Sequence, residues 1–125
     1  MKTTLERAVS AAQIMNRLNG IRMKSSATAR KIFTLAEELK KNFDFYANEE
    51  RKLIEELGGA IGEDGTILFD DQKEGIRKLK AGREELLKTE VDVAIDPPVI
   101  FRDAEGLPVS GEEIGILKGI AEFKE

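Results

Sequence analysis

A stretch of 31 residues, from Ala27 to Leu57, contains neither glycine nor proline and most constrains what this chain can fold into. Both residue types interrupt helices, so their absence favours one continuous helix, with Ser25 or Ser26 as its N-cap. At 1.5 Å per residue such a helix is roughly 45 Å long. A compact domain of 125 residues does not normally need so long an element. The expected fold class is therefore mainly α, arranged around one long helix.

Apolar residues recur along this stretch at alternating steps of three and four, which is the pattern of a heptad seam. Further apolar residues widen the stripe, which indicates packing against more than one neighbour. A seam of this kind can also pair with a second copy of the chain. Its members are Ala29, Ile32, Ala36, Leu39, Phe43, Tyr46, Leu53 and Leu57, and the residues that widen it are Phe33, Leu35, Ala47 and Ile54.

The middle of the seam holds the first candidate interaction residues. Glu50 is its one polar member, and we favour a helix face that turns into solvent there. The alternatives are an interrupted core where the third helix ends, or an ion pair with a basic neighbour. Phe43 and Tyr46 are predicted to lie in the core. Phe45 falls off the seam, so it contacts another element or belongs to an exposed aromatic patch, which marks a partner surface.

A first helix is predicted before the long one, over residues 4–19. Thr3 and Glu6 form a capping box at its start. Asn19-Gly20 is predicted to end it in the left-handed conformation. We expect this helix to fold back on the first part of the long helix.

A third helix and a short final helix are predicted after the long one. Asp70 or Asp71 caps the third helix, which spans residues 71–88 and lies beside the long helix. Its internal glycines, Gly75 and Gly82, either allow a close helix–helix approach or are simply tolerated. A second capping box, Ser110 with Glu113, begins a final helix that is predicted to continue through Ile120-Ala121.

Short extended segments complete the prediction. Asp64-Gly65 lies between two apolar runs and predicts a small β-hairpin. Apolar alternation predicts a strand over 90–95, and Val99-Ile100-Phe101 is a second short run before a turn at 103–106. We expect one domain over 1–125, an antiparallel helical hairpin or bundle. Its parts are a helix pair (1–57), a hairpin loop (58–70), a third helix (71–88), and strands with a short C-terminal helix (89–125).

The composition excludes much side-chain chemistry, because the chain has no cysteine and no histidine. It cannot form a Ser-His-Asp or Cys-His triad, a disulfide or a zinc finger. No phosphate-binding glycine motif is present. Paired carboxylates such as Glu49-Glu50 fall on predicted charged helix faces, where solvation is expected. We therefore expect no enzyme activity and no cofactor.

Acidic residues gather around the predicted hairpin, and carboxylate oxygens are the type of ligand that Ca²⁺ and Mg²⁺ bind. Their spacing matches no EF-hand loop. We favour turn and helix-capping roles over a metal site for this group, which consists of Glu63, Asp64, Asp70 and Asp71.

Charge is unevenly distributed. The net charge is −4, which argues against general nucleic-acid binding. Residues 1–35 nevertheless carry seven basic side chains and one acidic one, a net +6, which leaves −10 for the remainder. We favour a solvated basic face over a docking face for phosphates. The candidate contacts in this region are Arg17, Arg22, Lys24, Arg30 and Lys31.

No apolar run is long enough to span a membrane, and Glu6, Arg7 and Gln13 interrupt any signal-peptide core near the N-terminus. With no cysteine present, we expect a cytoplasmic protein.

The order of these segments resembles a family of small uncharacterised proteins encoded by tailed bacteriophages and prophages of Gram-positive bacteria. The likeness is carried by TLERAVSAAQIMNRL, by the bend and long helix SSATARKIFTLAEELKKNFDFYANEERKLIEELG, by the Glu-Asp-Gly turn, and by LLKTEVDVAIDPPVIF with the capped SGEEIGILKGI. It covers nearly the whole chain. The resemblance implies a phage or prophage origin and a non-enzymatic role, and it transfers no catalytic or binding residue.

We therefore expect a phage accessory or assembly factor that acts through protein–protein contacts, with a homo-oligomer through the long helix as one form. An inhibitor or modulator of a bacterial host protein is the alternative, since an acidic surface can occupy a basic nucleic-acid channel. Nucleic-acid contact through the basic N-terminal region is a further alternative.

Overall fold

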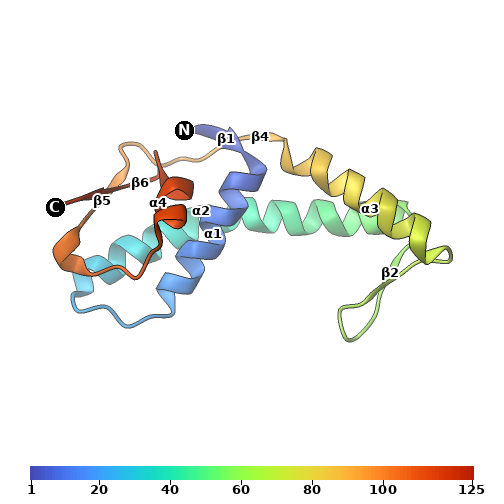
Figure 1. The fold of residues 1–125 in the computed structure, drawn as a ribbon, viewed down its shortest axis with the longest axis horizontal. Helices are drawn as coiled ribbons and strands as arrows, with labels where there is room; N and C mark the ends of the chain where they lie inside the picture. The colour runs from blue at the N-terminus through green and yellow to red at the C-terminus, as the bar shows by residue number, and fades with distance from the viewer.

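The computed structural model describes residues 1–125 and shows a mainly α fold built along one long helix (Figure 1). This helix, α2 (Ser26–Glu56), agrees with the predicted stretch to within one residue at each end. The Ser25 hydroxyl caps it by accepting a hydrogen bond from the Ala27 amide at 3.1 Å. Gly58 follows its C-terminal end with a φ of 77°, a conformation that favours glycine.

Helix α1 (Leu5–Asn19) packs on the N-terminal half of α2, as the sequence predicts (Figure 1). Two details at its ends differ from the prediction. Thr4, not Thr3, is the N-cap, because the helix begins at Leu5 and the Thr4 hydroxyl accepts a hydrogen bond from the Arg7 amide at 3.3 Å. Gly20 is right-handed, with a φ of −88°, because the chain closes the last turn with a bond from its amide to the Arg17 carbonyl.

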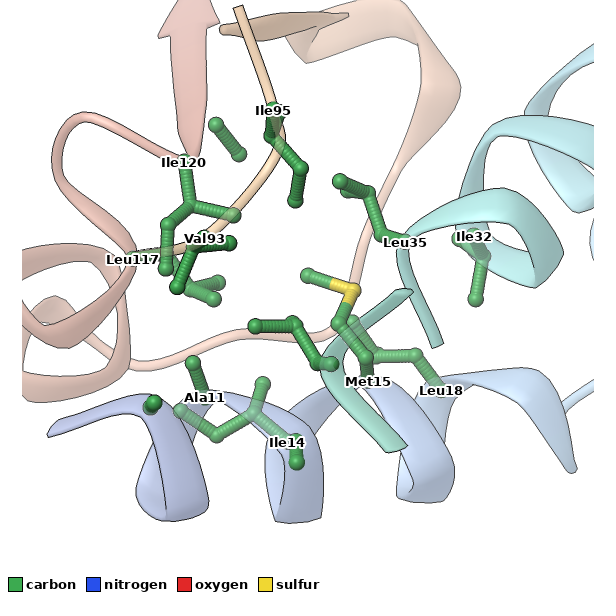
Figure 2. Close-up of a cluster of buried hydrophobic side chains, with 14 of the residues drawn as sticks. Ala11, Ile14, Met15, Leu18, Ile32, Leu35, Val93, Ile95, Leu117 and Ile120 are labelled. Atoms are coloured by element: carbon green, nitrogen blue, oxygen red, sulfur yellow. The ribbon is translucent and has the colours of Figure 1, made fainter. Parts of the chain in front are cut away.

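The main hydrophobic core lies where α1 and α2 meet the C-terminal third of the chain. Figure 2 shows side chains from four parts of the chain pointing toward one another. Helix α1 contributes several small residues, which let the backbones approach closely. The labelled members are Ala11, Ile14, Met15 and Leu18 from α1, Ile32 and Leu35 from α2, and Val93, Ile95, Leu117 and Ile120 from the C-terminal third.

Two strand pairs tie the ends of the chain to this core. Strand β1 (Lys2–Thr4) pairs antiparallel with β4 (Glu90–Asp92). Strand β5 (Val99–Arg102) pairs in parallel with β6 (Ala121–Lys124). The sequence prediction includes neither β1 nor β6, and the strand predicted over 90–95 ends at Asp92.

The final helix is shorter than predicted. Helix α4 (Gly111–Leu117) begins with the expected capping box of Ser110 and Glu113. It ends at Leu117, so the predicted continuation through Ile120-Ala121 is wrong. Gly119, with a φ of 88°, turns the chain so that Ala121 can begin β6, and Leu117 and Ile120 both remain buried.

Beyond the main core, the chain forms the predicted hairpin and third helix. Strands β2 (Ala60–Ile61) and β3 (Ile67–Leu68) pair antiparallel, with Gly65 in the turn at a φ of 84°. Helix α3 (Gln72–Leu87) starts at Asp71, whose carboxylate accepts a hydrogen bond from the Glu74 amide at 3.2 Å. It returns along the C-terminal half of α2, and the hairpin projects from the end of this pair (Figure 1).

The two glycines of α3 make room for different neighbours: Gly82 lets α3 approach Leu53 of α2 closely, and Gly75 accommodates the ring of Phe69, which precedes α3. A Cβ atom at Gly75 would lie 2.2 Å from Phe69 Cγ, and one at Gly82 would lie 2.6 Å from Leu53 Cδ2. An added methyl group has no room beside the base of the Phe69 side chain at Gly75, whereas at Gly82 it would displace the end of the Leu53 side chain. Ile54 and Leu79 are the large side chains buried between the two helices.

We predict that Gly75→Ala lowers the free energy of unfolding by about 1–3 kcal/mol, because the added methyl overpacks the space that the Phe69 ring fills. Urea denaturation followed by circular dichroism measures this change. Gly115→Ala is the control, since nothing lies within 4 Å of that added Cβ. The control gains up to about 1 kcal/mol from helix propensity. Equal stability of the two variants would contradict the close packing at Gly75.

Candidate interaction surface

Phe43 is the aromatic residue that the fold leaves uncovered on the packing side of α2. It is four residues after Leu39 and three before Tyr46, so the three share one side of the helix. Leu39 is fully buried and Tyr46 is half-buried, yet Phe43 is 38% exposed. The prediction that Phe43 lies in the core is wrong, because α1 covers the helix up to Leu39 and α3 covers it from Tyr46 onward.

A groove of about 340 Å³ lies between α1 and α2 beside Phe43. Its apolar part consists of Ala12, Ala36 and the Phe43 ring, and its other lining residues are polar or charged. Amide and charged side chains next to a small apolar area suit a peptide segment, which offers backbone groups and an occasional apolar side chain. The polar lining consists of Gln13, Asn16 and Asn19 on α1 with Glu37, Lys40 and Asp44 on α2.

Glu50 joins α2 to α3, so the favoured prediction that the helix face turns into solvent at this residue is wrong. One of its oxygens accepts hydrogen bonds from the Tyr46 hydroxyl and from Arg83 Nε, each at 2.9 Å. Burial raises the pKa of the Tyr46 hydroxyl above its usual range, and the Glu50 carboxylate adds to this effect. Tyr46 therefore stays a neutral donor. Tyr46 and Glu50 are structural here, and the less favoured alternative, an ion pair with a basic neighbour, is observed.

Phe45 is separated from Phe43 by two residues, or about 200° around the helix, so it lies on the opposite side of α2. It is 43% exposed. Its neighbours on that side are charged and form ion pairs along the helix, Lys41 with Glu38 and Lys52 with Glu49. Phe43 and Phe45 therefore do not form one aromatic patch.

Arg17 is engaged within the fold. It contacts Glu113 of α4, with 2.7 Å between Arg17 Nη2 and Glu113 Oε2, and also donates to the Pro108 carbonyl at 3.2 Å. The Ser110 amide holds the pKa of the Glu113 carboxyl below its usual range, and Arg17 reinforces this. This basic residue attaches α4 to α1 and is not a free phosphate contact.

Lys31 is engaged with the turn that follows β5. Its Nζ lies 2.9 Å from Glu105 Oε1, 2.9 Å from the Ile100 carbonyl oxygen, and 5.5 Å from the centre of the Phe101 ring. Glu105 belongs to the 3₁₀ turn η1 (Asp103–Glu105) and also accepts a bond from the Arg102 amide at 2.6 Å. The Lys31 and Glu105 side chains therefore bond the Ile100 carbonyl and the Arg102 amide. A further strand pairing with β5 would need these two backbone groups.

Thr28 completes the Glu105 site. Thr28 is a buried polar residue, and it takes the place in the packing stripe that the sequence assigns to Ala29, which is exposed. Its hydroxyl donates a hydrogen bond to Glu105 Oε1 at 2.5 Å. This hydrogen bond, with those from the Arg102 amide and Lys31, lowers the pKa of the Glu105 carboxyl to about 2. Glu105 therefore stays charged under ordinary conditions and holds the turn against α2.

The remaining candidates, Arg22, Lys24 and Arg30, are exposed and form no ion pair. They lie in the connector before α2 and in its first turns. The structure thus separates the five predicted basic contacts into two that hold the fold together and three that face solvent.

Sequence reasoning missed the exposed apolar side chains of the hairpin. Ile61 is 52% exposed and Leu68 is 56% exposed. The shortness of the predicted strands could have indicated this exposure, because an isolated two-stranded hairpin cannot bury both of its faces. Phe33 on α2, predicted to widen the packing stripe, is also 55% exposed.

The acidic residues near the hairpin have local structural roles. Asp64 accepts a hydrogen bond from the Thr66 amide at 3.0 Å, and that bond holds the pKa of its carboxyl below the usual range. Asp71 caps α3. No group of three or more such residues is arranged to hold a metal ion.

None of the helices combines the length and the apolar character needed to cross a bilayer. Comparisons with protein families, with curated proteins and with solved structures find no match for this chain. The fold itself therefore defines the class: a mainly α protein in which α1 and α3 pack on separate halves of one long helix.

We predict that Glu105→Gln lowers the free energy of unfolding by about 1–3 kcal/mol at pH 7, because it removes a charged hydrogen-bond acceptor. The pKa of Glu105 is about 2 in the folded chain against a reference value of 4.5. The unfolded chain therefore takes up the proton first, and stability is lost as pH falls from about 4.5 to about 2. The difference between wild type and variant should shrink across that window.

Urea denaturation at several pH values measures this difference. Glu84→Gln is the matched control, because Glu84 is exposed and forms no ion pair. A difference that stays constant down to pH 2 would contradict the assigned role of Glu105.

Proposed function

We propose that this protein is a non-enzymatic phage or prophage component that acts through protein–protein contacts as an accessory or assembly factor in the bacterial cytoplasm. The observation that carries the proposal is Phe43, an aromatic residue on the packing side of α2 that stays exposed beside an open groove. Large exposed aromatic residues next to a groove are typical anchors for a partner. The phage setting rests on the resemblance of the segment pattern.

The groove favours a peptide-like segment of a partner protein. Its three amide side chains, on α1, can bond a partner's backbone, and the Phe43 ring can contact one apolar side chain. Lys40 and Asp44 offer both signs of charge within the same groove, so the lining does not select for a polyanion. This favours a protein segment over nucleic acid.

The test is photo-crosslinking in a lysogenic host that expresses the full chain. A photoreactive amino acid at Lys40 reports the groove, and one at Phe45 reports the opposite side of α2. We predict that the Lys40 position crosslinks a phage protein and that Phe43→Ser lowers the yield about tenfold or more, since anchor aromatics contribute 2 kcal/mol or more. Phe45→Ser is the matched control, with similar exposure in the same helix.

Phe43→Ser should lower the melting temperature by about as much as Phe45→Ser does, because the two side chains are exposed to a similar extent, 38% and 43%. Equal crosslinking from both sides of α2, or crosslinking that ignores Phe43→Ser, would remove the groove as the contact.

A host protein is the alternative partner, favoured by the acidic end of the molecule. Residues 55–71 hold six acidic side chains and no basic one, and a projecting acidic hairpin suits a basic channel. In this case a pull-down with the full chain from host lysate recovers a host protein, and variants that remove acidic charge from residues 55–71 lower the recovery. Recovery of phage proteins alone would exclude this alternative.

A further inference from the structure

The two ends of α2 carry opposite charge. The connector at residues 20–25 and the first turns of α2 present Arg22, Lys24 and Arg30, which are exposed and unpaired. No acidic residue occurs in the sequence between Arg7 and Ala36, and Glu105, which packs against the first turns of α2, is neutralised by its ion pair with Lys31. The far end of α2 and the hairpin, residues 55–71, contain acidic residues and no basic one. The 31 residues of α2 hold these ends roughly 45 Å apart (Figure 1).

Each charged end also exposes apolar side chains. The hairpin presents Ile61 and Leu68. The basic end presents Ile21, beside Arg22 in the connector, and Phe33, three residues after Arg30 on α2. An apolar centre with a charged rim is the usual composition of a protein interface, and here the two rims have opposite sign.

Other routes to association are less favourable. Strand addition at β5 is obstructed, because Lys31 and Glu105 bond its Ile100 carbonyl and Arg102 amide. Pairing along α2 is opposed by its charged solvent side, which carries ion pairs of its own. The hairpin, by contrast, projects from the fold, and both of its strands have an unpaired outer edge.

We propose that the occupant of each end is a second copy of this chain, so that the acidic hairpin of one copy docks on the basic connector end of the next. Because the contact joins two different surfaces, it can repeat from copy to copy into an open head-to-tail chain, which is the arrangement proposed. An antiparallel two-fold dimer, in which each copy contributes one such contact, would instead stop at twice the mass of the monomer. The hairpin is small, and interfaces of this size class are weak and transient. This inference goes beyond the proposed function, because it uses neither Phe43 nor the groove.

Sedimentation velocity on the full chain tests the proposal. Loading from about 10 µM to 1 mM suits a weak interface. We expect an average mass that rises with concentration without a fixed end point at about 0.05 M salt, and that falls at about 0.5 M salt, where exposed charges are screened. A strictly monomeric wild type over this range would overturn the proposal.

Two charge-reversed variants make the test specific. One carries Arg22→Glu, Lys24→Glu and Arg30→Glu, and the other carries Glu55→Lys, Glu56→Lys and Glu63→Lys. Acidic residues near a helix N-terminus and basic ones near its C-terminus favour the helix dipole, so both variants should fold. Each alone should associate at least tenfold more weakly than wild type.

Mixing the two variants should restore association, because the unaltered hairpin of the first meets the unaltered basic end of the second. Leu68→Ser should weaken association of the wild type without any change in charge. A mixture that stays monomeric, or single variants that associate as well as wild type, would overturn the head-to-tail contact. Oligonucleotide binding by a monomeric wild type, lost in the Arg22 variant, would assign the basic end to nucleic acid instead.

Discussion

The length of α2 is the constraint on which the rest of this structure depends. With 31 residues, it is about twice as long as α1, with 15, or α3, with 16. Neither helix can cover it alone, so each packs on one half. The result is two buried regions joined by a shared helix, with an incompletely covered zone at Phe43 between them. The length of α2 therefore explains both why the chain has two buried regions and why Phe43 stays exposed between them.

Charge in this protein divides into structural and solvent-facing groups. Arg17, Lys31 and Arg83 each reach across to another part of the chain and bond a carboxylate. These bonds join elements that are distant in sequence, so they fix the C-terminal third and α3 against the first two helices. Among the charges without an ion pair are Arg22, Lys24 and Arg30 near the start of α2 and Glu55, Glu56 and Glu63 near its far end. The uneven charge in the sequence therefore becomes a difference between two ends of one molecule.

Local signals in the sequence predicted local structure well. The serine cap of α2, the Asp64-Gly65 turn and the Asp71 cap depend on neighbouring residues, and all are observed. The missed features depend on distant partners. Strand β1 exists because residue 91 lies beside residue 3, and α4 stops at Leu117 because the following residues pair with β5.

The candidate surface was also predictable only where it depends on local spacing and not on distant partners. Helical spacing placed Phe43 on the packing side correctly, but only the tertiary arrangement shows that no helix fully covers it. Glu50 was recognised as exceptional from its polar position in an apolar seam. Its partner, Arg83, is 33 residues away, and no local pattern points to it.

The unequal size of the two buried regions has a consequence for motion. The main core joins 15 buried residues from several elements, whereas the buried residues of α3 are Gly75 and Leu79. Segments with few buried contacts open locally at a lower free-energy cost than the whole domain. The α3 and hairpin end should therefore exchange its amide hydrogens through openings of its own, while α1 exchanges only when the main core unfolds.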